Sequence, residues 1–217
     1  MRRTLSCVLM MTLLLTACGG SGEESPENLA ARIRAEYLSL SGWSAEVFMT
    51  ADYGDRVYEF TVDATWAREG DTVLTITAPE LVAGITARLS DGVGYLEYEG
   101  ASLSTGPIGD GMNPLEAVPF VMEQVTAGYM ARCSFVEEGE QKLLRVLCRE
   151  AEGNEGTGGE CTLYFDVDSH DLVRAELSWD GVTVLTARLN EFTKEMSDGE
   201  RADHANLGGN QPGQSGT

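Results

Sequence analysis

Histidine and basic side chains are scarce in this chain of 217 residues. It has two histidines, and its 15 lysines and arginines stand against 35 aspartates and glutamates, a formal net charge of −20. So acidic a chain is not expected to bind nucleic acid, whose phosphates are recognised by Lys and Arg. His170 is predicted in a turn and His204 in a polar tail, and no G-x-S-x-G, H-E-x-x-H or Cys–His arrangement occurs. We therefore expect no catalytic residues and a protein that is not an enzyme.

Metal-binding patterns are also missing. The acidic stretch DVDSHD (166–171) does not follow the ligand spacing of an EF-hand loop. Asp, Ser and His are ordinary residues of tight turns, and a turn is the simpler interpretation. We expect neither a metal site nor a cofactor.

The apolar run from Leu5 to Leu15 is shorter than the roughly 20 residues of a membrane-spanning helix. It follows Arg2 and Arg3, and a basic start before a short apolar core is typical of a secretory signal. The tetrapeptide LTAC (15–18) resembles the lipobox of bacterial lipoproteins. That resemblance implies that Cys18 is acylated, that residues 1–17 are a signal peptide, and that the protein is anchored to the extracytoplasmic face of a bacterial membrane. The alternative is an ordinary cleaved signal with a chance cysteine.

The remaining length suits one domain. Residues 18–25 are small and polar, as expected of a tether. Residues 196–217 have few large apolar side chains, so they are expected to be disordered. The predicted domain covers residues 26–195.

Periodicity predicts a helix followed by strands. Ser25 and Pro26 suit the cap and first residue of a helix, and apolar residues recur from Leu29 to Leu40 at spacings of three and four. Alternation with period two then predicts five strands, separated by turn residues, at 45–53, 58–66, 74–78, 85–89 and 93–98. Five more are predicted at 129–136, 142–149, 161–167, 172–179 and 182–192.

The middle of the chain interrupts the strands. Residues 104–114 form a predicted loop with three glycines and two prolines. Asn113 and Pro114 suit the start of a second, apolar helix that extends to Val125. Pro119 falls inside it, and a proline there removes a hydrogen bond and kinks or breaks a helix. We expect a bent, movable segment.

The order of helix, five strands, broken helix and five strands resembles the lipoprotein carriers of the LolA and LolB family. Four local patterns carry the resemblance: SGWSAEVFM (41–49), WAR (66–68), RLSDGVGYLEYEG (88–100) and LYFDVDSHDLVRAELSWDG (163–181). It implies an α+β fold, mainly antiparallel β, in which a curved sheet of about ten strands forms a half-barrel. The N-terminal helix and the broken mid-chain helix would cover its apolar face.

In these carriers the helices leave an apolar cavity for acyl chains, and the resemblance implies such a cavity here. The alternative is that the same side chains pack as a dry core. The candidate lining residues are Tyr58, Phe60, Val62, Trp66, Leu74, Ile76 and Ile85 on the sheet and Leu115, Val118, Phe120 and Met122 on the lid.

Two functions follow from the resemblance. The first is a membrane-anchored lipoprotein that binds or carries acyl chains or another apolar ligand. The second is a non-enzymatic partner lipoprotein that binds and regulates a cell-envelope or spore cortex enzyme, because the chain is also similar in length, anchor and strand order to the germination lipoproteins of the GerS type.

Three cysteines remain after Cys7 and Cys18 are set aside, and they fall on consecutive predicted strands. An odd number outside the cytoplasm favours one disulfide and one free thiol. Cys148 and Cys161 flank a glycine-rich loop, so their bridge would close a hairpin, and a Cys133–Cys148 bridge is the alternative. Three reduced, buried thiols are the third possibility.

Overall fold

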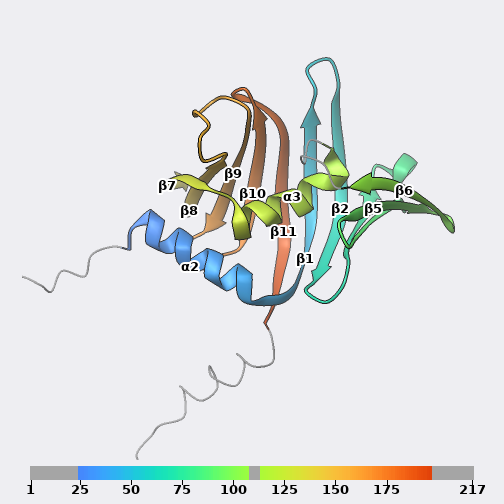
Figure 1. The fold of residues 1–217 in the computed structure, drawn as a ribbon, viewed down its shortest axis with the longest axis horizontal. Helices are drawn as coiled ribbons and strands as arrows, with labels where there is room; N and C mark the ends of the chain where they lie inside the picture. Colours follow the sequence, from blue (N-terminus) through green and yellow to red (C-terminus); the bar gives the residue numbers. More distant parts are fainter. Residues whose placement is uncertain (1–23, 108–112, 197–217) are drawn as a thin grey trace, which may run out of the picture.

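The computed structural model describes residues 24–107 and 113–196. Within them the chain forms two α-helices and an open antiparallel sheet of eleven strands (Figure 1). The predicted signal peptide, Cys18, most of the tether and residues 197–217 lie outside the described residues. The predicted class, an α+β half-barrel with helices on one face, is confirmed.

The elements follow the predicted order with one additional strand. The first half contains α2 (Pro26–Ser39), β1 (Leu40–Asp52), β2 (Val57–Ala67), β3 (Thr72–Ala78), the 3-10 turn η1 (Glu80–Val82), β4 (Thr86–Ser90), β5 (Val93–Tyr98) and β6 (Ala101–Pro107). The second half contains α3 (Pro114–Ala127), β7 (Met130–Glu138), β8 (Gln141–Arg149), β9 (Gly159–Asp166), β10 (Leu172–Trp179) and β11 (Val182–Met196).

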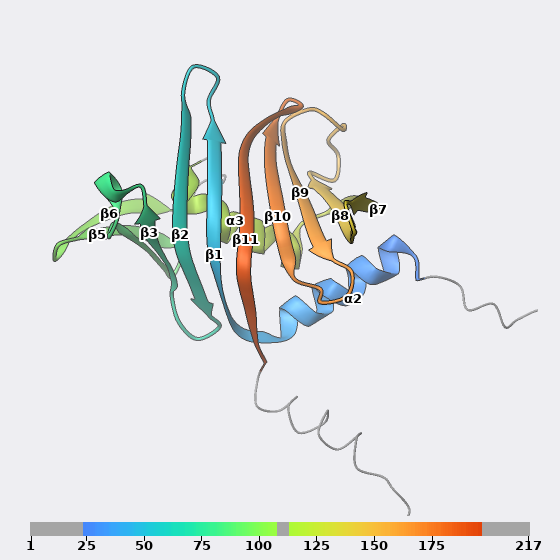
Figure 2. The same ribbon diagram turned by 180° about the vertical axis from the view of Figure 1, so that it is seen from behind.

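The first and last strands meet in the middle of the sheet. The spatial order is β6-β5-β4-β3-β2-β1-β11-β10-β9-β8-β7, so each half of the chain is a meander and β1 pairs with β11. Both helices lie over one face of the sheet, which we call the inner face, and the sheet curves around them (Figures 1 and 2). The edges of the sheet are β6 and β7.

Both helices begin where the sequence predicts. The Ser25 hydroxyl accepts a hydrogen bond from the Asn28 amide at 3.3 Å, and Asn113 Oδ1 accepts one from the Leu115 amide at 3.1 Å. In each case proline is the next residue, whose missing amide proton costs nothing at a helix start. Local capping chemistry therefore sets both starts.

The middle of the chain differs from the prediction in two ways. The predicted break is absent, and α3 is one continuous helix of 14 residues that contains Pro119. Its apolar side chains, among them Ala117, Val121 and Val125, are buried, and this packing offsets the hydrogen bond that proline cannot make. Part of the predicted loop is strand β6, which pairs with β5 as an edge strand.

The core lies between the inner face and the helices. Alternate residues of the central strands point inward and are fully buried, while their neighbours Glu46 and Asp63 are exposed on the outer face. The fully or almost fully buried side chains include Val47, Met49, Val62, Leu74, Leu177 and Leu185 of the sheet and Leu29, Ile33 and Val118 of the helices.

Candidate functional site

A cavity of about 580 Å³ lies near the inner face, beside the C-terminal half of α3. We call it the glycine-loop cavity, because residues 153–159 form part of its wall. Ligand pockets in proteins typically enclose about 300–1,000 Å³, so this space is large enough for a small apolar molecule. The lining side chains include Phe120 and Gln124 of α3, Tyr129, Cys148, Arg149, Glu160, Cys161 and Trp179.

Glycine residues in the wall of this cavity leave space that larger side chains would occupy. Gly159 lies directly under the Trp179 ring, where a Cβ atom would approach the indole to 3.5 Å. At the end of α3, a Cβ on Gly128 would come within 2.7 Å of the Gln124 carbonyl oxygen, a contact that real Cβ atoms do not make. Larger residues would therefore fill the space or displace the helix end.

Hydrogen bonds fix the loop that closes the cavity. The Gly158 amide donates to Asp180 Oδ1 at 2.8 Å, and the Gly156 amide donates to Glu160 Oε1 at 2.9 Å. The carboxylate of Glu155 forms a bidentate pair with Arg132 of β7, at 2.6 and 3.0 Å. The loop is thus attached to the β10–β11 turn and to the edge of the sheet.

An arginine from α2 holds the C-terminal end of α3 beside the cavity. Arg34 Nε donates to the Val125 carbonyl at 2.9 Å, and its Nη2 donates to the carbonyls of Gly128 at 2.6 Å and Gln124 at 3.3 Å. The last carbonyls of a helix have no intrahelical partner and carry partial negative charge, so a guanidinium group stabilises them.

A second cavity, the inter-helix cavity, lies on the other side of α3. Its volume is about 250 Å³, and its walls come from both helices and from strands β1 to β3. Trp43 and Trp66 contribute indole rings from the sheet, and Met122 contributes a flexible thioether from α3. The remaining lining residues are Tyr37, Thr72, Pro119, Glu123 and Thr126.

The eleven predicted lining residues do not surround one space. Trp66 and Met122 line the inter-helix cavity, and Phe120 lines the glycine-loop cavity. Leu115 borders a third space of about 40 Å³ next to β4 and β5. Val62, Leu74, Ile76 and Val118 are buried in the core, Phe60 and Ile85 pack against it, and Tyr58 is exposed. Side chains of the core therefore fill most of the space under the N-terminal half of α3, apart from this small space at Leu115.

Sequence reasoning does not find the glycine-loop cavity. The sequence EAEGNEGTGGE (150–160) predicts only a long loop, yet it forms one wall of this cavity. Its glycine content and its position between two cysteine-bearing strands are the available signals. Neither shows that the loop stands away from α3.

The three cysteines described by the structure are free thiols. Cys148 and Cys161 are direct partners across β8 and β9, and both line the glycine-loop cavity. Burial raises the pKa of Cys148 to about 11 and that of Cys161 well above its usual range. The charge of Arg34 opposes the rise at Cys148, whereas the Cys133 thiol adds to it, and the Cys148 thiol adds to the rise at Cys161. Such thiols are protonated at neutral pH and are poor nucleophiles. The predicted disulfide is not formed in the structure and stays a prediction.

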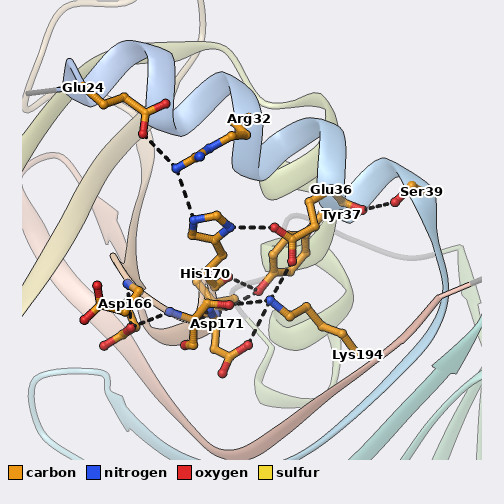
Figure 3. Close-up of polar contacts among 12 residues, drawn as sticks. Glu24, Arg32, Glu36, Tyr37, Ser39, Asp166, His170, Asp171 and Lys194 are labelled. Carbon is orange, nitrogen blue, oxygen red and sulfur yellow. Dashed lines mark hydrogen bonds and ion pairs between the residues drawn. The ribbon is translucent and has the colours of Figure 1, made fainter. Parts of the chain in front are cut away.

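A polar cluster joins α2 to the β9–β10 turn and to β11 (Figure 3). Glu36 accepts a hydrogen bond from Lys194 Nζ and pairs with His170 Nδ1, each at 2.7 Å. Lys194 also lies 3.0 Å from Asp171. The buried Tyr37 hydroxyl donates to the His170 carbonyl at 3.1 Å and accepts from the Leu172 amide at 2.8 Å. The cluster fixes the helix on the sheet.

The cluster shows why His170 occupies the turn. Its φ of 60° places it in the left-handed region, so its ring can reach Glu36 while its carbonyl faces Tyr37. Burial alone would raise the pKa of Glu36, but the hydrogen bonds and charges of Lys194 and His170 outweigh it and lower that pKa. In residues 24–107 and 113–196, no three His, Cys, Asp or Glu side chains gather as a metal site would require.

Neither α2 nor α3 is long and apolar enough to cross a membrane, and no other α-helix occurs in the described part of the chain.

Comparison with known proteins finds similar folds at very low sequence identity. No protein-family profile matches the chain, and no curated protein matches it at a significant level. An uncharacterised conserved protein from Thermus thermophilus is 10% identical, with 81% of this chain and 92% of that chain covered and a TM-score of 0.49.

Two further structures belong to the groups that the sequence resembles. A LolA superfamily protein from Nitrosomonas europaea is 7% identical, with 81% and 95% of the two chains covered and a TM-score of 0.40. A chain in the structure of the CwlD amidase from Clostridioides difficile in complex with the GerS lipoprotein is 11% identical, with 79% and 96% covered and a TM-score of 0.41. All three TM-scores are below 0.5.

Proposed function

We propose that the protein is a membrane-anchored lipoprotein on the extracytoplasmic face of a bacterial membrane, where it binds an apolar ligand such as an acyl chain and catalyses no reaction. The glycine-loop cavity carries the proposal. Its volume is about 580 Å³, and the rings of Phe120 on α3, of Tyr129 and of Trp179 on β10 form part of its wall. The rings and protonated thiols offer an apolar chain favourable contact, while Arg149 and Glu160 give the same wall a charged part.

The polar groups of the cavity lie where they would orient such a ligand. Arg149 is turned toward its own loop, since Nη1 donates to the carbonyls of Glu150 and Gly153. Its Nε is buried and has no hydrogen-bond partner among the described residues. A buried donor without a partner is costly, and a ligand that brings an acceptor oxygen would satisfy it. We therefore favour an amphipathic ligand, such as a lipid or a fatty acid, over a pure hydrocarbon.

Mass spectrometry of protein purified from its native host tests this proposal. We expect a lipid to co-purify with the wild type and to be lost from Phe120→Gln, which places an amide in the wall of the glycine-loop cavity. Met122→Gln is the matched control, because Met122 lies on the same helix but lines the inter-helix cavity. Wild-type protein without any co-purified lipid would count against the proposal. If Met122→Gln alone lost the lipid, the ligand would be assigned to the inter-helix cavity instead.

The alternative function, binding and regulation of a cell-envelope or cortex enzyme, is supported by a different observation. Strand β6 is one of the two edges of the sheet, and Leu103 on it is 66% exposed. The unpaired backbone groups of an edge strand can accept a strand of another protein. Replacement of Ser104 by proline would remove an amide from this edge. Loss of a co-purified envelope protein from that variant, with lipid retained, would favour the partner function.

A further inference from the structure

One row of paired residues crosses the inner face close to one end of the sheet. Each residue of the row is the direct cross-strand partner of the next: Met130, Cys148, Cys161, Leu177, Leu185, Ala51 and Tyr58. The β1–β2 turn, the β10–β11 turn and the β8–β9 loop lie just beyond the row and project past α3 (Figures 1 and 2). We call this end of the molecule the loop end.

Exposed apolar side chains are concentrated at the loop end. Ten large hydrophobic residues of the described chain are exposed, and six of them lie here. The six, which we call the aromatic rim, are Tyr53, Val57, Tyr58, Tyr129, Trp179 and Val182. Because β1 pairs with β11, the two hairpin tips are neighbours, and the Tyr53 and Tyr58 rings contact each other with centroids 6.2 Å apart.

The aromatic rim is continuous with the glycine-loop cavity. Trp179 is 50% exposed and Tyr129 is 52% exposed, yet both also line the cavity. A molecule that enters or leaves the cavity past these rings crosses the rim. Tyr and Trp combine an apolar ring with one polar atom, and they are the side chains that gather where hydrocarbon meets water at a membrane.

The charged side chains around the aromatic rim determine which type of lipid surface it could bind. The turns and the loop carry the carboxylates of Asp52, Asp55, Asp180, Glu150 and Glu152, and Arg56 is the basic residue of the β1–β2 turn. Anionic headgroups would be repelled by this end, since a surface of like charge raises the free energy of contact. A lipid surface of low net charge is the surface that fits both the rings and the carboxylates.

We propose that the aromatic rim docks on a lipid surface of low net charge, so that the glycine-loop cavity opens toward the acyl chains. The inference rests on the proposed function, because docking brings the cavity to its ligand. An anchor at the N-terminus would leave the domain free to turn, and the rim sets which end meets the lipid.

Fluorescence quenching in vesicles tests the docking. The full-length protein is reconstituted into phosphatidylethanolamine and phosphatidylcholine vesicles that contain lipid with brominated acyl chains, which quench nearby tryptophan. The difference between wild type and Trp179→Phe isolates Trp179, because Trp43 and Trp66 are common to both. We expect quenching of Trp179 in these vesicles and a clear loss of quenching when phosphatidylglycerol replaces most of the neutral lipid.

A variant with added negative charge on the aromatic rim tests whether docking depends on the rim. Val57→Asp with Val182→Asp should abolish the quenching of Trp179, whereas Leu38→Asp should leave it unchanged. Leu38 is 53% exposed but lies at the end of α2, away from the loop end. Absence of quenching in neutral vesicles would overturn the proposal, and so would stronger quenching in anionic vesicles. Loss of a co-purified protein from the rim variant, without lipid quenching in the wild type, would assign the rim to a protein partner instead.

The two proposals fail in different ways. Phe120→Gln should lose co-purified lipid but keep the quenching of Trp179, while the double rim variant should keep a lipid that is already bound. Docking without any ligand would refute the proposed function alone, and a bound ligand without docking would refute the further inference alone.

Discussion

Cys148 on β8 and Cys161 on β9 are direct partners in an antiparallel pair, with both thiols on the inner face. Opposite residues of antiparallel strands have Cα atoms about 4.5–5.5 Å apart, which is within the range that a disulfide spans. Cys133 is the direct partner of Val146 instead, so it lies diagonally from Cys148. The register therefore favours the Cys148–Cys161 bridge over the Cys133–Cys148 alternative.

We expect one disulfide, between Cys148 and Cys161, in protein exported to an oxidising compartment. In the chain-entropy model a bridge that closes a loop of this size stabilises the fold by roughly 3 kcal/mol. Thiol titration of denatured mature protein should find one free thiol, and peptide mapping should place it at Cys133.

Cys133→Ser is the matched control, because it should leave the bridge intact and bring the free thiol count to zero. Three free thiols in wild-type exported protein would exclude the bridge. A mapped Cys133–Cys148 linkage would show that the diagonal pair forms instead.

The cluster around Glu36 should make the stability of the fold depend on pH. The pKa of Glu36 is lowered in the folded state, so its contribution is present above its unfolded value near 4.5 and is lost as the pH falls through the lower folded value. Hydrogen bonds to charged groups contribute about 2 kcal/mol, and Glu36→Gln should lower the free energy of unfolding by that order at neutral pH.

Denaturant unfolding at neutral and at acidic pH checks this expectation. The difference between wild type and Glu36→Gln should shrink as the pH falls below the unfolded pKa of glutamate. Glu46→Gln, an exposed position on the outer face, serves as the control and should change the stability little at either pH. An unchanged difference at acidic pH would contradict the role assigned to the carboxylate.

Local patterns in the sequence were sufficient for most elements of the fold. The caps at Ser25 and Asn113 depend on neighbouring residues, and the alternation of β2 is visible within eleven residues. The structural features that the sequence did not predict depend on packing between residues far apart in the chain. Pro119 stays helical because α3 is buried against the sheet, and Glu36 meets Lys194 although 158 positions separate them. The cavity depends on how far one loop stands from α3, which no local pattern encodes.

Lipidation of Cys18 stays a prediction, since Cys18 lies outside the described residues. Cys18→Ser should either release the protein from the membrane fraction or stall its processing, because the cysteine thiol receives the diacylglycerol group in bacterial lipoproteins. Fractionation and mass spectrometry of the mature N-terminus check this. Cys133→Ser should remain in the membrane fraction, and a Cys18→Ser protein that is cleaved normally and still attached would contradict the prediction.

Helix α3 is expected to act as a lid over the inner face. It separates two cavities, so part of its surface has no packed neighbour, and Pro119 removes one of its internal hydrogen bonds. Its C-terminal end is tied to α2 by the three hydrogen bonds of Arg34. The N-terminal half should therefore move more readily, with the C-terminal end as the hinge.

Hydrogen exchange distinguishes this lid from a fixed plug whose side chains only fill the core. Amides from Leu115 to Met122 should exchange faster than those of β1 and β11, and they should slow when a fatty acid is added, because a ligand held beneath the helix stabilises the closed state through contacts that opening would break. Arg34→Met should accelerate exchange at the C-terminal end of α3, since it removes the bonds to Val125 and Gly128. Exchange of α3 as slow as that of the central strands, with no response to any lipid, would identify a fixed plug and favour the partner-binding function.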